Sequence, residues 1–432
     1  MKTTTRWLLI AGIAAALAAC GGGLLGNQGR IRLVNATTGL GALDLLVNDE
    51  AVITGVAPTA GSDYVLRKAD TYPLVIRQSG SAASLLTTST TLVADKHQTV
   101  VAYNSGGTTA ASILDDEEAD PGRNKAKFRV FNTATASADQ VDVYLITTAC
   151  NTLDTSAAAP TAAGVSGLQT AYTELASSAT AYFLCVTSAG DKSDVRLEIP
   201  SFVLTEKRIV TVILARGAGG YLMNAILLEQ QGAGTQALNA SARARVATSV
   251  PAPTALDVSV NGTPIAAGIT APNVGPYVLV PAGPVALKVG SSDVTPVAPL
   301  TAAPGADLTV LLMGVTPTAT LIADDNTPSS STARAVKLRL VNGLNGASTA
   351  TPATLTLNNV LVGNGTGPGL ASGYSQVQAS AGLARLEARV GTLTFYFDQT
   401  ATLESNRVYS LFLLGDIGSP VPPNRGILVP DR

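Results

Sequence analysis

Apolar and polar residues alternate in short stretches along the chain after its first 20 residues. Residues 256–260 read LDVSV, and residues 43–47 and 141–145 follow a similar pattern. Alternation with a period of two places one face of a β-strand on a core and the other toward water. Turn residues such as Asn261-Gly262 follow, because Asn tolerates the positive φ of tight hairpins. The pattern predicts strands joined by hairpins.

One pattern opens four stretches of about 100 residues. Each begins with a basic residue, an apolar or small residue, an arginine and then Val or Leu, followed by a polar loop and an alternating strand. The marker arginines are Arg32, Arg129, Arg245 and Arg339, at spacings of 97, 116 and 94 residues. About seven short strands in each stretch predict an all-β chain of four tandem immunoglobulin-like β-sandwich domains.

The predicted divisions of the chain follow these repeats and the polar stretches between them. A tether is expected at 20–29, and the sandwich domains at 30–118, 125–230, 242–325 and 335–432. The stretches 115–125, 231–241 and 326–334 are short and polar, which is typical of linkers with limited hinge motion. We therefore expect a string of domains on the order of 110 Å long, because each strand spans roughly 27 Å.

The chain begins with a targeting segment. After Lys2 and Arg6, residues 7–17 form an apolar run of eleven residues, shorter than the roughly 20 residues that span a membrane. This predicts a secretory signal peptide over 1–19. Residues 17–20, LAAC, resemble the lipobox of bacterial lipoproteins. The resemblance implies that Cys20 becomes the first mature residue and carries fatty acyl chains such as palmitate. An ordinary signal peptide with an incidental cysteine is the alternative.

The expected location follows from the lipobox. Gly21, rather than Asp, follows the cysteine, and resemblance to sorted lipoproteins then implies the outer membrane, on its periplasmic or surface face. Membrane attachment through the N-terminal lipid is therefore one expected interaction. The mature chain, without Lys2 and Arg6, carries a net charge of about −4 and has no basic cluster, so no nucleic-acid partner is expected.

Two further cysteines, Cys150 and Cys185, form an even pair in an exported chain. Export favours oxidation, so we expect a disulfide between them. Two buried free thiols are the alternative. A bridge would close a loop of about 35 residues and stabilise the second domain by roughly 3 to 4 kcal/mol.

The densest acidic cluster supplies a weak candidate metal site. Asp115, Asp116 and Glu118 carry the oxygen ligands that calcium prefers, and calcium between tandem sandwiches can stiffen them. Their spacing matches no calcium loop, so a solvated linker is the competing interpretation. We expect no cofactor.

Other residues give no catalytic pattern. Asp44, Asp142 and Asp257 recur at matching places, but Thr354 stands there in the fourth repeat. Structural pairing across strands is the expected role, and a ligand groove is the alternative. His97 is the sole histidine and is expected on the surface, and no G-x-S-x-G motif occurs. We therefore expect a protein that is not an enzyme.

The opening strand, the polar loop, the [LV]-D-[VL] strand and the lipobox together resemble bacterial lipoproteins of the domain-of-unknown-function 4397 family. The resemblance covers nearly the whole mature chain and implies fold, export and surface association. The expected function is non-enzymatic interaction, adhesion or spacing in the cell envelope, with an unknown envelope protein or polysaccharide as partner. Exposed strand edges could recruit a partner strand by β-augmentation. The alternative is an accessory or catalytic protein acting on a cell-surface carbohydrate or polymer.

Overall fold

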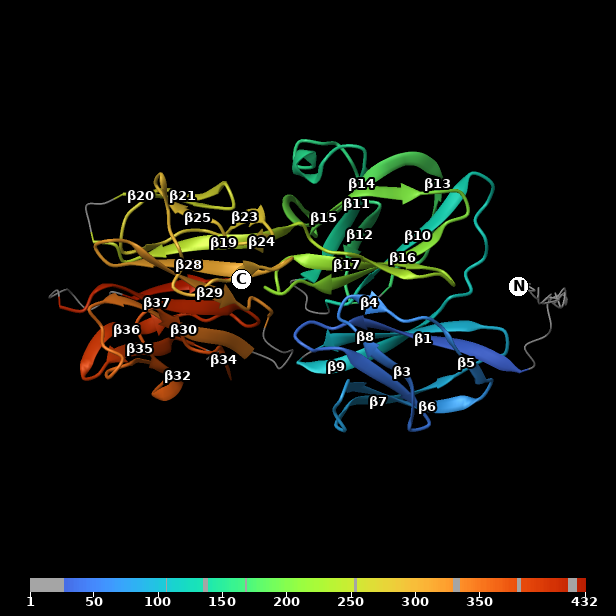
Figure 1. The fold of residues 1–432 in the computed structure, drawn as a ribbon, viewed down its shortest axis with the longest axis horizontal. Coiled ribbons are helices and arrows are strands. Elements are labelled where there is room, and N and C mark those ends of the chain that lie inside the picture. The colour runs from blue at the N-terminus through green and yellow to red at the C-terminus, as the bar shows by residue number, and fades with distance from the viewer. Residues whose placement is uncertain are drawn as a thin grey trace, which may run out of the picture.

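The computed structural model describes residues 27–105, 107–134, 139–167, 169–251, 255–328, 335–378, 382–418 and 426–432. The regular structure in these residues is almost entirely β-strand, with a short 3₁₀ helix at Cys150–Thr152. The strands form four successive β-sandwich units, which confirms the predicted fold class (Figure 1). In the described part of the chain, no helix is long and apolar enough to cross a membrane.

The first unit shows the plan that recurs. Its outer sheet has the order β3-β2-β6-β7, and its inner sheet, which faces the next unit, has the order β4-β1-β8-β9, with β5 also paired to β1. The strands are β1 (Gln28–Ala36), β2 (Leu43–Val47), β3 (Glu50–Val56), β4 (Ala60–Gly61), β5 (Val65–Lys68), β6 (Thr71–Gln78), β7 (Ser84–Thr91), β8 (His97–Ser105) and β9 (Thr108–Asp115). β1 and β8 are parallel, whereas the other pairs in this unit are antiparallel.

The second unit has a longer outer sheet. Its inner order is β13-β10-β16-β17-β18 and its outer order is β12-β11-β14-β15. The strands are β10 (Lys125–Asn132), β11 (Val141–Ile146), β12 (Ala162–Val165), β13 (Thr173–Ala176), β14 (Ser178–Ser188), β15 (Asp191–Leu204), β16 (Ile209–Arg216), β17 (Met223–Glu229) and β18 (Gly234–Ala237).

The third unit has the inner order β22-β19-β28-β29, with β23 also on β19, the outer order β21-β20-β25-β26, and a small β24-β27 sheet. The strands are β19 (Ser241–Thr248), β20 (Leu256–Val260), β21 (Thr263–Ile269), β22 (Asn273–Val274), β23 (Val278–Pro281), β24 (Gly283–Pro284), β25 (Leu287–Val289), β26 (Ser292–Asp293), β27 (Thr301–Ala302), β28 (Asp307–Met313) and β29 (Thr318–Asp324).

The fourth unit closes the described chain. Its inner order is β33-β30-β37-β38, with β34 also on β30, and its outer order is β32-β31-β35-β36. The strands are β30 (Ala335–Asn345), β31 (Ala353–Leu357), β32 (Val360–Thr366), β33 (Leu370–Ala371), β34 (Ser375–Gln378), β35 (Ala384–Val390), β36 (Leu393–Ala401), β37 (Val408–Asp416) and β38 (Gly426–Pro430).

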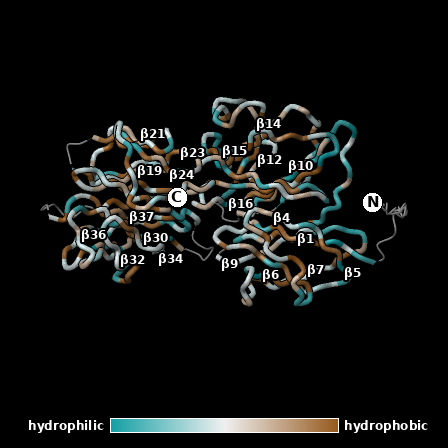
Figure 2. Tube along the Cα trace, in the orientation of Figure 1, coloured by the Kyte–Doolittle hydropathy of each residue, from teal (hydrophilic) through white to brown (hydrophobic). Residues whose placement is uncertain are grey.

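The inner sheets are buried on both faces. β16 reads IVTVILAR, and its first seven residues are all buried. One face packs in the core of its own sandwich, as Val212 does, and the other packs against the neighbouring unit, as Ile213 does. Two-sided burial explains why these strands carry continuous apolar runs instead of alternation. Apolar segments, drawn in brown, follow many of the strands (Figure 2).

The units associate in pairs through these inner sheets. Val34 of the first unit packs in one cluster with Phe131 and Ile213 of the second. Ala247 of the third unit likewise packs with Val341 and Phe412 of the fourth. In Figure 1 the blue and green units form one pair, and the yellow and red units form the other.

The two pairs also touch. A Cβ atom on Gly217 would lie 2.7 Å from the Cα atom of Gly305, and the amide of Gly219 donates to the Gly305 carbonyl at 2.8 Å. Only glycine permits this approach of two backbones. The expected string of domains placed end to end is therefore wrong, because each inner sheet has a second apolar face that must also be buried.

Candidate functional site

The marker arginines do not lie on the surface. All four are buried on the first strand of their inner sheets, where each Nε donates to a hydroxyl on the parallel neighbouring strand. These pairs are Arg32 with Thr99 at 2.6 Å, Arg129 with Thr211 at 2.8 Å, Arg245 with Thr309 at 2.9 Å, and Arg339 with Ser410 at 2.8 Å. The arginine that marks each repeat thus fixes the parallel pair at its centre.

A tyrosine covers each of these guanidinium groups. The stacked tyrosines are Tyr64, Tyr172, Tyr277 and Tyr374, with the arginine Cζ atom 4.3 to 4.5 Å from the ring centre. A planar guanidinium stacks well on an aromatic face, and the attraction is stronger away from water. This is where a substantial share of the chain's few aromatic residues is used.

A carboxylate completes the group in three of the four units. The Tyr277 hydroxyl donates to Asp324 at 2.6 Å, and the Thr309 hydroxyl donates to the same carboxylate oxygen at 2.6 Å. Asp116 and Asp431 hold the same place in the first and fourth units. We call each arginine, hydroxyl, tyrosine and carboxylate set an arginine cluster.

The second unit departs from this plan. Thr211 lies opposite Leu228, as Ser410 lies opposite Val429. Two residues further on, Gln230 therefore stands where the fourth unit has Asp431. The first pair of units contains two marker arginines but one carboxylate, whereas the second pair contains two of each.

The clusters exchange partners across the second pair of units. Arg245 Nη1 of the third unit lies 2.6 Å from the carboxylate of Asp431 in the fourth. In return, Arg339 of the fourth unit binds Asp324 of the third. Each unit thus supplies the counter-ion of the other, and the two sheets are held in one register.

The first pair uses a different arrangement. Arg32 Nη2 binds Asp116 of its own unit at 3.1 Å and also donates to the Glu229 carbonyl of the second unit at 3.1 Å. Arg129 binds Thr211 through Nε, but its buried Nη2 atom has no hydrogen-bond partner among the described residues. The missing carboxylate at position 230 accounts for this difference.

Burial and neighbouring charges oppose each other in their effect on the pKa of Asp324, whereas burial and the charge of Asp324 act together on the pKa of Tyr277. Burial alone would raise the pKa of Asp324, but Arg339 and Arg245 outweigh it and hold the pKa below its usual value. Burial, reinforced by the charge of Asp324, raises the pKa of Tyr277 well above its usual value. At neutral pH Asp324 is therefore ionised and Tyr277 is a neutral donor.

A further ionic group joins the two pairs. Asp139, which is fully buried, lies between Arg196, Arg216 and Arg432, with Arg216 Nη2 at 2.5 Å and Arg196 Nη1 at 3.7 Å. Burial raises the pKa of Asp139, but the charges of Arg432 and Arg216 outweigh it and lower the pKa overall. Three units meet here, since Tyr221 of the second stacks on Arg243 of the third at 3.6 Å and on Arg432 of the fourth at 5.1 Å.

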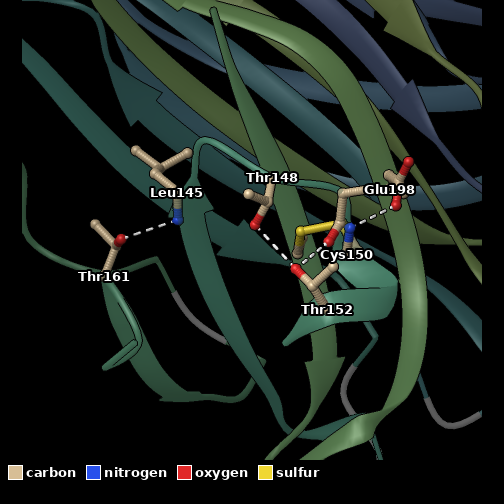
Figure 3. Close-up of a disulfide and its surroundings, with 8 residues drawn as sticks. Leu145, Thr148, Cys150, Thr152, Thr161 and Glu198 are labelled. Atoms are coloured by element: carbon tan, nitrogen blue, oxygen red, sulfur yellow. Dashed lines mark hydrogen bonds between the residues drawn. A yellow bond between two sulfur atoms is a disulfide. The ribbon is translucent and has the colours of Figure 1, made fainter. Parts of the chain in front are cut away.

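The expected disulfide between Cys150 and Cys185 is present, and both residues are buried. It ties the 3₁₀ helix to β14 (Figure 3). Glu198 of β15 accepts the Cys150 amide at 2.9 Å.

A cavity of about 460 Å³ lies beside this disulfide. Asp154, Lys192, Glu198 and Leu222 of the second unit and Leu279 of the third are among its lining residues. It is a mixed polar and apolar space at the boundary between two units.

The calcium candidates do not share a site. Asp116 is turned inward to Arg32, Glu118 binds Lys127, and Asp115 is an exposed acceptor for Gln98 at 3.4 Å. Among the residues that the structure describes, no group of three or more His, Cys, Asp or Glu side chains is placed to hold a metal ion. Cys20, the predicted lipidation residue, lies outside the described residues.

The repeated aspartates all bind backbone amides, and Asp44 also pairs across strands, as expected, with Arg77 opposite it on β6 at 3.4 Å. Asp44 accepts the amide of Gly55 at 3.0 Å and Asp257 that of Gly268 at 2.8 Å, both glycines having positive φ. Asp142 accepts Gly164 at 2.7 Å and also Gly190 at 2.9 Å. Each lies where the register of two outer strands shifts, so the aspartate satisfies an amide exposed by a β-bulge.

The sole histidine is not a surface residue. His97 is mostly buried at the start of β8, where Nδ1 lies 2.8 Å from Glu117 and the ring packs edge-on against Tyr64. The expectation of a surface position is wrong, because the acidic segment that follows β9 packs against the start of β8 and places Glu117 beside the ring.

Comparison with known proteins identifies a family. The family model described as "Domain of unknown function (DUF4397)" matches residues 29–144 and 242–347. No curated protein matches the chain. Among solved structures, the match to "The Bacillus anthracis TIE protein" has 9% identity, covers 90% of this chain and 68% of that one, and has a TM-score of 0.14, which is too low to support an argument.

The description of this family names no activity. The matched regions begin three residues before Arg32 and Arg245 and cover just over half of the chain. The protein therefore belongs to the DUF4397 family.

Proposed function

We propose that this chain is a lipid-anchored protein of the bacterial cell envelope that acts as a rigid, non-enzymatic interaction, adhesion or spacer protein. The observation that supports the proposal is the exchange of ion pairs between units, Arg245 with Asp431 and Arg339 with Asp324. Buried pairs of this kind favour one arrangement of the sheets over others. A body fixed in this way holds its outer surfaces at a set distance from an anchor.

The proposed anchor is acylated Cys20, on the outer membrane and facing either the periplasm or the cell surface. Two or more acyl chains give stable attachment, whereas one chain holds only marginally. β1 begins at Gln28, so the tether from Cys20 reaches at most about 28 Å. Mass spectrometry of the native protein tests the anchor. A diacylglyceryl mass on an N-terminal peptide beginning at Cys20 supports it, and an unmodified cysteine there rejects it.

The proposed partner is an envelope protein or polysaccharide. The test uses the lipid-free chain from residue 21 to 432 as bait on intact envelopes, with cross-linking before extraction. Recovery of one partner that also binds the purified chain supports the interaction role. If the purified chain turns over an envelope polymer instead, the non-enzymatic role is wrong.

The cavity beside the disulfide favours a second candidate, an accessory or catalytic protein acting on a cell-surface carbohydrate or polymer. Asp154 and Glu198 place two carboxylates on its wall. Asp154→Asn and Glu198→Gln should abolish such an activity, whereas Asp293→Asn, at a carboxylate with an 86% exposed side chain, should not. Equal binding and turnover by all three variants would reject this candidate.

A further inference from the structure

In the described part of the chain, one edge of the first unit's outer sheet has no neighbouring strand. β7 is the last strand in the order β3-β2-β6-β7, and no other strand of the described chain pairs with its far side. It reads SLLTTSTT, with no charge, proline or glycine. Thr87 and Ser89 are exposed.

The register shows which backbone groups point outward. Leu92 donates its amide to Asp70 on the β6 side, whereas the carbonyl of Thr91 accepts from the Gln98 side chain at 3.2 Å. Backbone groups alternate in direction along a strand. Thr88 and Thr90 therefore bond toward β6, and Thr87 and Ser89 direct their N–H and C=O groups to the open edge.

The position of Pro73 on β6 supports the outward direction of the backbone groups of Ser89. Ser89 lies opposite Pro73, which has no N–H to offer, and the Pro73 carbonyl accepts the amide of Asn48 on the other side. Ser89 thus has no backbone bond to β6.

The corresponding edges of the other units are protected. β15 carries five charged residues and Pro200, and its pairing shifts register four times. β26 has two residues, and β36 contains Asp398 and shifts register twice. By contrast, β7 pairs regularly with β6 over six successive residues, from Thr71 opposite Thr91 to Ile76 opposite Leu86.

Natural sheet edges are usually blunted by charges, prolines, bulges or short length, because a regular uncharged edge pairs with other strands. The opposite edges of all four outer sheets, β3, β12, β21 and β32, show such register shifts. The β7 edge lacks these protective features.

We propose that β7 is a self-association site, at which two copies of the chain pair antiparallel around a two-fold axis at Thr88. Thr87 of each copy then lies opposite Ser89 of the other, and the two residue pairs exchange four backbone hydrogen bonds. The two outer sheets become one continuous sheet of eight strands.

Two properties of the edge favour a second copy over a foreign strand. The arrangement of open groups is self-complementary, since Thr87 and Ser89 lie at equal distances on either side of Thr88. The edge also carries no charge, so two identical edges meet without repulsion, and facing Thr and Ser hydroxyls form favourable cross-strand pairs. The inference does not depend on the lipid anchor.

Sedimentation velocity of residues 21–432 over a concentration series tests the proposal. Wild type and the matched control Ser89→Ala should form dimers. Ser89→Pro should weaken dimerisation at least tenfold while keeping the wild-type circular dichroism, because the lost N–H points outward and proline is tolerated on an edge. A wild-type chain that stays monomeric, or a Ser89→Pro dimer of unchanged affinity, overturns the proposal.

Cross-linking tests the register independently of the proline variant. Residues facing each other at a non-hydrogen-bonded antiparallel position have Cα atoms about 4.5 Å apart, within disulfide range. Thr88→Cys should therefore form a covalent dimer on oxidation, whereas Thr91→Cys, three residues from the axis, should not. Equal yields, or none from Thr88→Cys, overturn the proposed pairing. A monomeric chain whose β7 edge binds another protein also overturns it.

Discussion

The guanidinium of Arg245 in the third unit lies 2.6 Å from the carboxylate of Asp431 in the fourth, nearly two hundred residues along the chain. Both side chains are buried. The same two units also contribute the reverse pair, Arg339 with Asp324. The arginines that mark the third and fourth repeats in the sequence are thus also the residues that join these two units.

Removing one charge from these two reciprocal ion pairs should strongly lower the free energy of unfolding. Arg339→Met leaves Asp324 buried with only the more distant Arg245 as an ionic partner, at 3.9 Å. We expect a loss of about 3 to 5 kcal/mol in the free energy of unfolding, measured by denaturant titration. Arg389→Met is the control, because Arg389 is 52% exposed in its pair with Glu387, and it should cost less than about 1 kcal/mol. Similar losses for the two variants would contradict the buried exchange.

Replacement of the marker arginine by methionine should lower the free energy of unfolding less in the second unit than in the fourth. Arg129 has a hydroxyl bond to Thr211 and a stacking contact with Tyr172, but its Nη2 atom is unpaired in the described structure. Arg129→Met therefore removes an unsatisfied donor along with these contacts, and should cost about 1 kcal/mol. The measurement is the same denaturant titration. A loss as large as that of Arg339→Met would show that Arg129 has a charged partner.

The repeated aspartates should contribute in proportion to the amides they bind. Asp142→Ala removes two charge-assisted bonds, from Gly164 and Gly190, and should lower the free energy of unfolding by about 3 kcal/mol. Asp257→Ala removes one bond at an exposed position and should cost about 1 kcal/mol. Thermal unfolding measures both. The reverse order would contradict the bulge-binding role.

Acid should destabilise the assembly of units. The pKa values of Asp139 and Asp324 lie below their ordinary values, whereas burial raises that of Asp307. A lowered pKa contributes stability that is present above the unfolded value, about 3.9, and is lost as pH falls through the folded value. The raised pKa of Asp307 has the opposite effect, so the contribution of Asp307 to stability falls as pH rises. We expect the denaturant midpoint to fall below about pH 4, and a midpoint that rises there would contradict these assignments.

The strands were largely readable from the sequence, and their assembly was not. Alternation at residues 256–260 predicts β20 because one face of an outer sheet is solvated. β7 gives no such signal, since SLLTTSTT is mostly hydroxyl residues on both faces. The continuous apolar run of β16 indicates a strand that is buried on both faces. Such a strand needs a packing layer on each side of its sheet.

The arginine clusters could be found only in part. The marker arginines repeat visibly, but a single sequence does not show that Arg245 faces another unit. The stacking tyrosines carry a weaker signal, since Tyr64 and Tyr277 each follow their arginine by 32 residues. Asp116 was expected in a solvated linker, because polarity alone does not distinguish exposed acids from acids paired in the interior.

Small-angle X-ray scattering of residues 21–432 at low concentration tests the central claim that the four units form one compact body. A compact chain of this length has a radius of gyration of about 22 Å, and the paired arrangement predicts a monomer value within a few ångströms of it. An end-to-end string of about 110 Å would give about 32 Å or more. The larger value would contradict the account.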